Sequence, residues 1–335
     1  MTEIRPEPLR SPLLSVDGLR VDIGTPRGTL RAVRGISFDI AAGETLCLVG
    51  ESGCGKSMTA LALMGLLPGA AKRSAARMSF EGEDLAGISP RRLSALRGNR
   101  MAMIFQEPMT ALNPAYTIGD QLMEVHRRHK GSTVAQARDR AVELLEKVGI
   151  TAAAERLGQY PHQLSGGLRQ RVMIAMALMC GPTLLIADEP TTALDVTIQA
   201  QILRLLIDLQ RDLGIAILLI THDLGVVARV AHRVAVMYAG EVVESATAAA
   251  LFASPRHPYT RGLMASIPIP GRTPPGERLG AIPGIVPSLI GEVQGCAFRD
   301  RCSYAFAECA VAVPWRAEGD HGWRCTLAEV PAEAA

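Results

Sequence analysis

The sequence Gly50-Glu-Ser-Gly-Cys-Gly-Lys-Ser57 follows a short apolar run, Leu46–Val49, and fits the pattern G-x-x-x-x-G-K-[ST]. In such a phosphate loop, Lys56 reaches the β- and γ-phosphates of a nucleotide and Ser57 ligates Mg²⁺. Its glycines permit the backbone angles that let N–H groups converge on phosphate oxygens. We therefore expect a nucleotide to contact eight residues: Gly50, Glu51, Ser52, Gly53, Cys54, Gly55, Lys56 and Ser57.

A second glycine-bearing turn, Leu164-Ser-Gly-Gly-Leu-Arg-Gln-Arg171, opens a predicted helix. The first turn of a helix can offer N–H groups to a phosphate. A chain that binds one nucleotide does not need two phosphate-binding turns for that nucleotide. The second turn is therefore predicted to serve the nucleotide of another subunit, which indicates an ATPase that works as a sandwich dimer.

Length and charge set the limits for the rest of the chain. The 335 residues can form one large domain with an extension, or two domains. The 35 Lys and Arg nearly balance the 33 Asp and Glu. The net charge is therefore too small to give the protein a positive electrostatic field that would attract nucleic acid. No apolar run approaches the ~20 residues that span a bilayer, and the N-terminus lacks the apolar core of a signal peptide. We expect a cytoplasmic chain that reaches a membrane only through a partner.

The pattern along the chain predicts three parts. Residues 1–12, rich in proline and charge, are expected to form a loose arm. Residues 13–255 alternate apolar strands with helices, which is typical of an α/β fold with a parallel sheet, and residues 117–180 within them are mainly helical. Residues 256–335 form an extension that contains a proline- and glycine-rich linker at 268–287 and ends in a cysteine-bearing segment.

Two helices can be given bounds from the sequence. Ser57–Leu67 is expected to form a helix that stops at Pro68-Gly69. Ala135–Val148 carries apolar residues at helical spacing and is expected to form a helix that ends at Gly149.

Polar side chains follow three further predicted strands. Leu184–Ala187 leads into Asp188, which can support Mg²⁺, and Glu189, which can polarise the attacking water. His222 is placed to contact the γ-phosphate, and the Gln106 amide could approach both Mg²⁺ and water. Taken singly, the acids could be solvated strand caps and the histidine structural. Beside a phosphate loop, their combination favours catalysis.

The order of these motifs resembles that of the ATP-binding cassette (ABC) family from residue 13 to about 255. The resemblance implies a P-loop NTPase fold with a RecA-like core, an antiparallel β subdomain and a helical subdomain. It implies that Glu189 is the catalytic base, assisted by His222 and Gln106. It also implies ATP and Mg²⁺ as cofactors, with the metal held by Ser57, Gln106 and Asp188.

The same resemblance assigns residues to a dimer interface. The signature residues, which would contact ATP on the opposite subunit, are Leu164, Ser165, Gly166, Gly167 and Gln170. Asp195 would cross the interface. The family usually stacks an aromatic ring on adenine, but the matching position here holds Ile23, so we expect an apolar contact with the base.

Two further segments, Gln106–Pro114 and His257–Leu263, resemble the ATPases of oligopeptide, dipeptide and nickel importers. This implies an ATPase that powers peptide import, together with a second ATPase subunit (a copy or a paralogue), two transmembrane permeases and, indirectly, an extracytoplasmic binding protein. Such a chain lies at the cytoplasmic face of the bacterial inner membrane.

Two alternative functions remain. One alternative is import of nickel or another small solute. A soluble ABC ATPase of DNA repair or translation is the other, although the chain has one cassette and no room for a long coiled coil.

The cysteines divide into two sets. Cys47 and Cys180 are expected to be buried fillers, and Cys54, inside the phosphate loop, to be sensitive to oxidation. The late set comprises Cys296, Cys302, Cys309 and Cys325. Four late cysteines in a cytoplasmic chain favour a metal over disulfides, but their spacing lacks the paired C-x-x-C of many zinc sites. The importer resemblance implies a 4Fe–4S cluster with a structural or redox-sensing role. Zinc, disulfides and free thiols remain alternatives.

Overall fold

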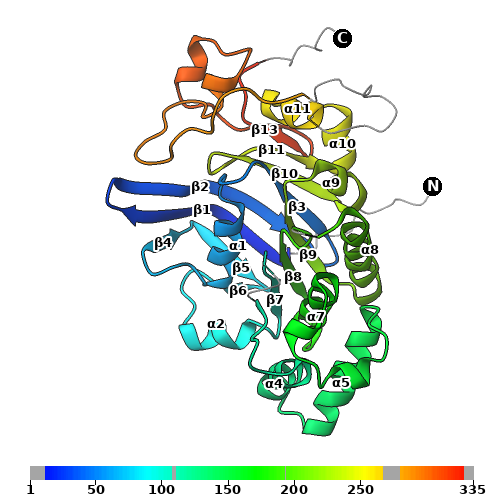
Figure 1. Ribbon diagram of the computed structural model, residues 1–335. Coiled ribbons are helices and arrows are strands. Elements are labelled where there is room, and N and C mark those ends of the chain that lie inside the picture. The colour runs from blue at the N-terminus through cyan, green and yellow to red at the C-terminus, as the bar shows by residue number, and fades with distance from the viewer. Residues whose placement is uncertain (1–11, 108–110, 193, 267–279, 328–335) are drawn as a thin grey trace, which may run out of the picture.

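The structure, a computed structural model, describes residues 12–107, 111–192, 194–266 and 280–327. Two β-sheets lie at the centre of these residues, with a group of helices at one end and the C-terminal segment, residues 280–327, at the other (Figure 1). None of the helices in the described ranges is both long and apolar enough to cross a membrane.

The main sheet has eight strands within the described residues, in the order β12-β13-β11-β10-β3-β9-β8-β7. Their bounds are Thr45–Val49 (β3), Met101–Ile104 (β7), Leu184–Asp188 (β8), Ala216–Thr221 (β9), Arg233–Tyr238 (β10), Glu241–Thr247 (β11), Arg316–Glu318 (β12) and His321–Trp323 (β13). The five strands from β10 to β7 are parallel. Every residue of β3, β8 and β9 is buried, as expected for a parallel sheet covered on both faces. The predicted parallel α/β sheet is confirmed.

The second sheet is antiparallel, in the order β2-β1-β5-β6 with β4 also paired to β1. Its strands are Leu14–Thr25 (β1), Gly28–Ile40 (β2), Ala71–Ser74 (β4), Arg77–Phe80 (β5) and Glu83–Asp84 (β6). Buried residues of this sheet share one core with helix α1 (Lys56–Met64) and with side chains of the main sheet such as Leu48 and Leu218. The second sheet thereby fixes α1, and the phosphate loop before it, against the main sheet.

The helix predicted at Ser57–Leu67 is shorter than expected. It ends at Met64 because Gly65 takes the left-handed conformation (φ 62°) and its N–H closes the last turn on Ala62 and Leu61. The sequence pattern placed the end at the later Pro68-Gly69 pair and did not detect this glycine cap. The helix predicted at Ala135–Val148 is confirmed at Val134–Lys147.

The predicted helical region forms a subdomain at the lower end of Figure 1. Its elements are α4 (Ile118–Lys130), α5 (Val134–Lys147), α6 (Ala153–Arg156) and α7 (Gly166–Leu178), with a short 3₁₀ turn at Pro161–Gln163. Thr117 is the N-cap of α4 and Thr133 is the N-cap of α5, each in a reciprocal capping box with the residue three positions later. These caps define where the two helices begin and fix the loop between them.

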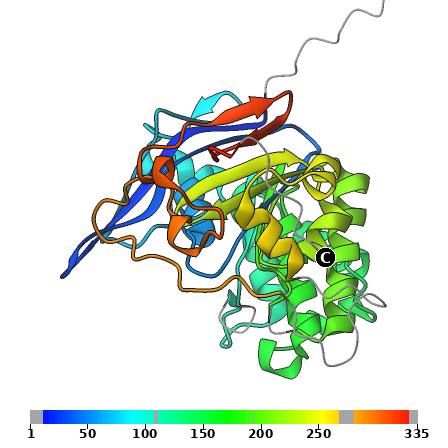
Figure 2. The same cartoon turned by 90° about the horizontal axis from the view of Figure 1, so that it is seen from above.

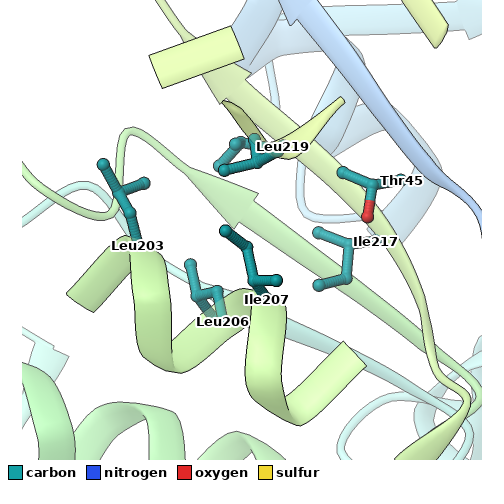
Figure 3. Close-up of a pocket in the computed structure, with 7 residues that line it drawn as sticks. Thr45, Leu203, Leu206, Ile207, Ile217 and Leu219 are labelled. Atoms are coloured by element: carbon teal, nitrogen blue, oxygen red, sulfur yellow. The ribbon is translucent and has the colours of Figure 1, made fainter. Parts of the chain in front are cut away.

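The remaining helices lie around the sheets. They are α2 (Pro90–Leu96), α8 (Val196–Leu213), α9 (Leu224–Val230), α10 (Ala248–Ala253) and α11 (Pro258–Ala265). Leu203, Leu206 and Ile207 of α8 face Ile217 and Leu219 of β9 (Figure 3). The gap between them is apolar and about 10 Å³, so it is a packing defect between helix and sheet rather than a ligand site.

The C-terminal segment is an integral part of the fold. Strand β13 pairs with β11 and so extends the main sheet, and Figure 2 shows the segment lying over the sheets, away from the helical subdomain. Phe298 is buried, with its ring 5.2 Å from that of Tyr238 and 5.3 Å from that of Tyr259. The predicted arm and linker fall largely on residues 1–11 and 267–279, outside the described residues. Residues 280–287 have no helix or strand.

If Phe298 belongs to the common core, Phe298→Ala should lower the free energy of unfolding by about 3–5 kcal/mol, the usual cost of truncating a buried aromatic ring. Phe306 of the same segment is 41% exposed, so Phe306→Ala should cost less than about 0.5 kcal/mol. Urea denaturation of the full chain measures both. Equal, small effects would contradict a shared core.

Candidate active site

The carboxyl ends of four neighbouring parallel strands meet at one edge of the main sheet. β3 leads into the phosphate loop with Lys56, and the strand ends of β7, β8 and β9 are followed or closed by Gln106, Glu189 and His222. The strand order β3-β9-β8-β7 places these loops side by side although they are distant in sequence. Ligands of open α/β sheets bind at this edge.

The phosphate loop packs too closely for side chains at two of its glycines. A Cβ on Gly50 (φ 155°) would lie 2.1 Å from the Met237 carbonyl oxygen, and one on Gly55 (φ 104°) would lie 2.3 Å from the Ala32 carbonyl oxygen. Gly53 also has a positive φ, at 79°. The loop therefore requires glycine for backbone angle, as predicted from the sequence, and also for space, which the sequence did not reveal.

Lys56, at the start of α1, is buried inside this loop. Its ammonium group donates hydrogen bonds to the carbonyl oxygens of Gly50, at 2.8 Å, and Glu51, at 3.0 Å. It also lies 4.0 Å from the Glu189 carboxylate. The phosphate-binding cation and the candidate base are thus already next to each other.

Ser57 and Asp188 are also brought together. The Ser57 hydroxyl donates to Asp188 Oδ1 at 3.0 Å, although the two residues come from α1 and β8. Burial raises the pKa of Asp188, the Ser57 hydrogen bond opposes this, and the nearby Glu189 carboxylate adds to the rise. A divalent cation between these two oxygen ligands would stabilise the ionised carboxylate, so the pair fits the predicted Mg²⁺ site.

Glu189 is the centre of the polar cluster. Its Oε2 accepts hydrogen bonds from Gln106 Nε2 at 3.2 Å and from Thr192 Oγ1 at 2.9 Å. Its Oε1 lies 3.4 Å from His222 Nδ1. The cluster therefore unites Gln106, Glu189 and His222 as the sequence predicted. It adds Thr192, which sequence reasoning missed; the only signal was a hydroxyl three residues after the acid, in a turn.

The backbone at Glu189 is strained. Its φ is +43°, in the left-handed region that favours glycine, and its N–H donates to the Ile220 carbonyl oxygen at 2.9 Å. A non-glycine residue in this conformation costs of order 1–3 kcal/mol, and such strain clusters at functional sites. Here the turn carries the carboxylate from the end of β8 to the centre of the cluster.

The signature residues lie at the start of α7. Ser165 is the N-cap and accepts a hydrogen bond from the Leu168 N–H at 3.4 Å, and Ser165 and Gly166 are exposed. Leu164 and Gln170 are buried beneath them. Asp195 begins α8 and is also exposed, followed by Val196, whose exposed fraction is 81%. The signature turn and Asp195 are thus open to a partner.

The C-terminal segment reaches the phosphate loop. Arg301 donates two hydrogen bonds to the Glu51 carboxylate, at 2.7 and 3.0 Å, and the Glu51 N–H donates to the Tyr259 hydroxyl at 2.9 Å. The Glu51 carboxylate holds the pKa of Arg301 above its usual value. The segment is distant in sequence from the catalytic residues, yet it touches the nucleotide site. Sequence reasoning missed both partners because no local pattern links them to Glu51.

The cysteines differ from expectation at one position. Cys47 and Cys180 are buried, as predicted. Cys54 is fully buried as well, and burial raises the pKa of its thiol despite the nearby Lys56 ammonium. Because the thiolate is the reactive form, burial and the raised pKa both disfavour the oxidation expected of Cys54. The described residues contain no group of three or more His, Cys, Asp or Glu arranged to hold a metal ion, so the metal site of the late cysteines remains a prediction.

Two other predictions remain open. Ile23 is half-buried near the end of β1, between Leu30 of β2 and Ala71 of β4, and its contact with adenine stays a prediction. The segment Gln106–Pro114, which resembles the importer ATPases, is described only at Gln106, Glu107 and 111–114. Residues 108–110 lie outside the described residues.

Comparison with known proteins places this geometry in a family. A family profile described as ABC transporter matches residues 33–192, and one described as the C-terminal region of oligopeptide/dipeptide transporters matches residues 243–309. The dipeptide transport ATP-binding protein of Bacillus subtilis is 50% identical, over 96% of this chain and 97% of its own length. The chain belongs to the ABC transporter family, in its oligopeptide/dipeptide branch.

Other relatives agree with this assignment. A putative peptide import ATP-binding protein of Brucella melitensis is 51% identical, over 94% of this chain and 97% of its own length. Among solved structures, a dimeric ATP-binding cassette in a post-hydrolysis state bound to ADP and Pi superimposes with a TM-score of 0.63 at 25% identity. That match covers 70% of this chain and 98% of the solved one. The P-loop fold predicted from the sequence is confirmed.

If Glu189 is the base, Glu189→Gln should lower ATP turnover by ~10²–10⁴-fold while ATP binding is retained, because a positioned base contributes about that much. Glu143→Gln, which alters an exposed acid of α5, is the control and should turn over ATP normally. Phosphate release and nucleotide binding by the purified complex measure the two effects. Near-normal turnover by Glu189→Gln would remove Glu189 from this role.

Proposed function

We propose that this chain is the ATP-hydrolysing subunit that powers import of dipeptides and oligopeptides across the cytoplasmic membrane. The observation that carries the proposal is the cluster around Glu189, where Gln106, His222 and Lys56 meet beside the Ser57–Asp188 pair. The choice of peptides as the solute rests on the names of the relatives that share half of its residues over nearly the whole chain.

The geometry suits hydrolysis of ATP to ADP and phosphate. The phosphate loop binds the β- and γ-phosphates through its N–H groups and Lys56. Ser57 and Asp188, together with Gln106, would hold Mg²⁺, whose charge would offset the negative charge of the transferred phosphoryl group. Glu189 accepts a proton from the attacking water, and His222 orients the γ-phosphate and that water.

Gln106 and Thr192 set the direction in which the Glu189 carboxylate points. Both donate to its Oε2, which leaves Oε1 toward Lys56 and His222. A carboxylate fixed in this way loses little conformational entropy when the water binds. Ile23 supplies an apolar contact to the adenine base.

The proposed partners follow from exposed surfaces and family membership. The Ser165–Gly167 turn, which is exposed at Ser165 and Gly166, and the exposed Asp195 belong to an interface with a second ATPase subunit, whose nucleotide the turn contacts. Two permeases in the membrane anchor the pair at its cytoplasmic face, and an extracytoplasmic binding protein delivers the peptide to them. Closure of the dimer on ATP would move the helical subdomain and transmit force to the permeases.

The function is tested by uptake. Cells that lack this gene should lose import of a labelled dipeptide, the wild-type gene should restore it, and the Glu189→Gln variant should not. A tagged chain extracted from membranes in mild detergent should retain two permeases and a second ATPase. Normal dipeptide uptake with loss of nickel uptake would contradict the solute, and recovery without permeases would contradict the transport role.

We also propose that the late cysteines bind a 4Fe–4S cluster. Burial raises the pKa of Cys296 to about 11, and the Cys309, Cys325 and Cys302 thiols add to the rise. The Cys296 N–H donates to the Cys309 carbonyl oxygen at 2.8 Å. Neighbouring thiols help to raise the pKa of Cys296, Cys302 and Cys325, and a bound cationic centre would stabilise their thiolate forms. Cys₄ thiolates are the usual ligands of such clusters.

Protein purified anaerobically should then contain about four irons per chain and absorb broadly in the visible range. Cys302→Ser should lose the iron, whereas Cys180→Ser, which alters a buried thiol of the ATPase core, should keep it. Metal analysis and the absorption spectrum measure both. Stoichiometric zinc without iron, or neither metal, would contradict the cluster.

A further inference from the structure

Glu51 of the phosphate loop is hydrogen-bonded to residues of the C-terminal extension, 256–335. Arg301, in the 3₁₀ turn Arg299–Arg301, holds both oxygens of its carboxylate, at 2.7 and 3.0 Å. The Arg301 side chain is only 5% exposed and that of Glu51 is 30% exposed. The two-point geometry sets the orientation of the carboxylate as well as its position.

Arg301 is itself immobilised. Its remaining hydrogen bonds go to the carbonyl oxygens of Pro283, at 2.8 Å, and Ile282, at 3.1 Å, and to the Tyr238 hydroxyl at 3.4 Å. Its guanidinium lies 5.7 Å from the ring centre of Tyr238 and 6.0 Å from that of Phe298. Each N–H direction has an acceptor, so the side chain has little freedom to leave Glu51.

The backbone of Glu51 is held at the same point. Its N–H donates to the hydroxyl of the buried Tyr259, and its carbonyl oxygen accepts from Lys56. The loop Gly50–Gly55 contains three glycines and so has a high conformational entropy when it is not held in place. Contacts that fix Glu51 restrict the loop before any phosphate arrives.

We infer that Arg301 is a positioning residue for nucleotide binding: by fixing Glu51 it keeps the phosphate loop in the form that accepts phosphate. The C-terminal segment would then set the affinity for ATP without touching it. The apparent affinity of a ligand falls in proportion to the fraction of the protein in the binding-competent form. Releasing the loop should therefore weaken the binding of ATP and leave the chemical step unchanged.

Arg301→Gln in the assembled full-length complex tests this. The dissociation constants of ATP and ADP should both rise, by about tenfold, because removing one partner of a charged hydrogen bond typically changes an equilibrium by at least that factor. The turnover rate at saturating ATP should stay within about twofold, since Glu189, Gln106 and His222 are untouched. The result is a rise in KM without a fall in kcat.

Arg299→Gln is the matched control. Arg299 belongs to the same turn and pairs with its exposed neighbour Asp300. Its replacement should leave ATP affinity unchanged. Equal weakening by both variants would show a general effect of the segment and would overturn the specific role of Arg301.

A double-mutant cycle links the effect to Glu51. Glu51→Gln alone should also weaken ATP binding, and the double variant with Arg301→Gln should bind ATP no more weakly than the weaker single variant. Additive losses would show that Arg301 does not act through Glu51. If Arg301→Gln lowers the melting temperature so far that binding cannot be measured, Arg301→Lys, which keeps the charge and loses the two-point grip, replaces it in the cycle. Unchanged ATP affinity in whichever of these variants folds would overturn the inference.

Discussion

The parallel order of β3, β9, β8 and β7 is the constraint on which the active site depends. A parallel sheet brings all its strands' carboxyl ends to one edge, so the residues that follow them meet without any contact in sequence. Lys56, Gln106, Glu189 and His222 each come from a different strand end. The second sheet then holds α1 and the phosphate loop against this edge through a shared apolar core.

The features that could be predicted from the sequence are local ones. A phosphate loop needs glycines at fixed spacing, and a buried parallel strand needs an apolar run such as Leu184–Ala187. Both patterns can be recognised within a few consecutive residues. Asp188 and Glu189 were predictable for the same reason, because they directly end that strand. The exposed turn at Ser165 was predictable from its glycines and its place before a helix.

Features that depend on tertiary contacts were not predictable. The end of α1 at Met64 is decided by the left-handed Gly65, three residues before a more conspicuous Pro-Gly pair. Burial of Cys54 follows from the close packing of the loop on β10, which its position among glycines does not reveal. Arg301 and Tyr259 reach Glu51 across 250 and 208 residues of chain, and no periodicity in the sequence encodes contacts of that range.

The C-terminal segment is joined to the ATPase core by pairing, packing and charge. Strand β13 continues the main sheet, Phe298 enters the core, and Arg301 pairs with the phosphate loop. A buried guanidinium that loses its carboxylate partner is left with an uncompensated charge, so loop and segment each depend on the other's position. Coupling between two binding events is reciprocal. If docking of the segment raises the affinity for ATP by some factor, bound ATP must favour docking of the segment by the same factor. The Arg301–Glu51 contact is the physical link between the two.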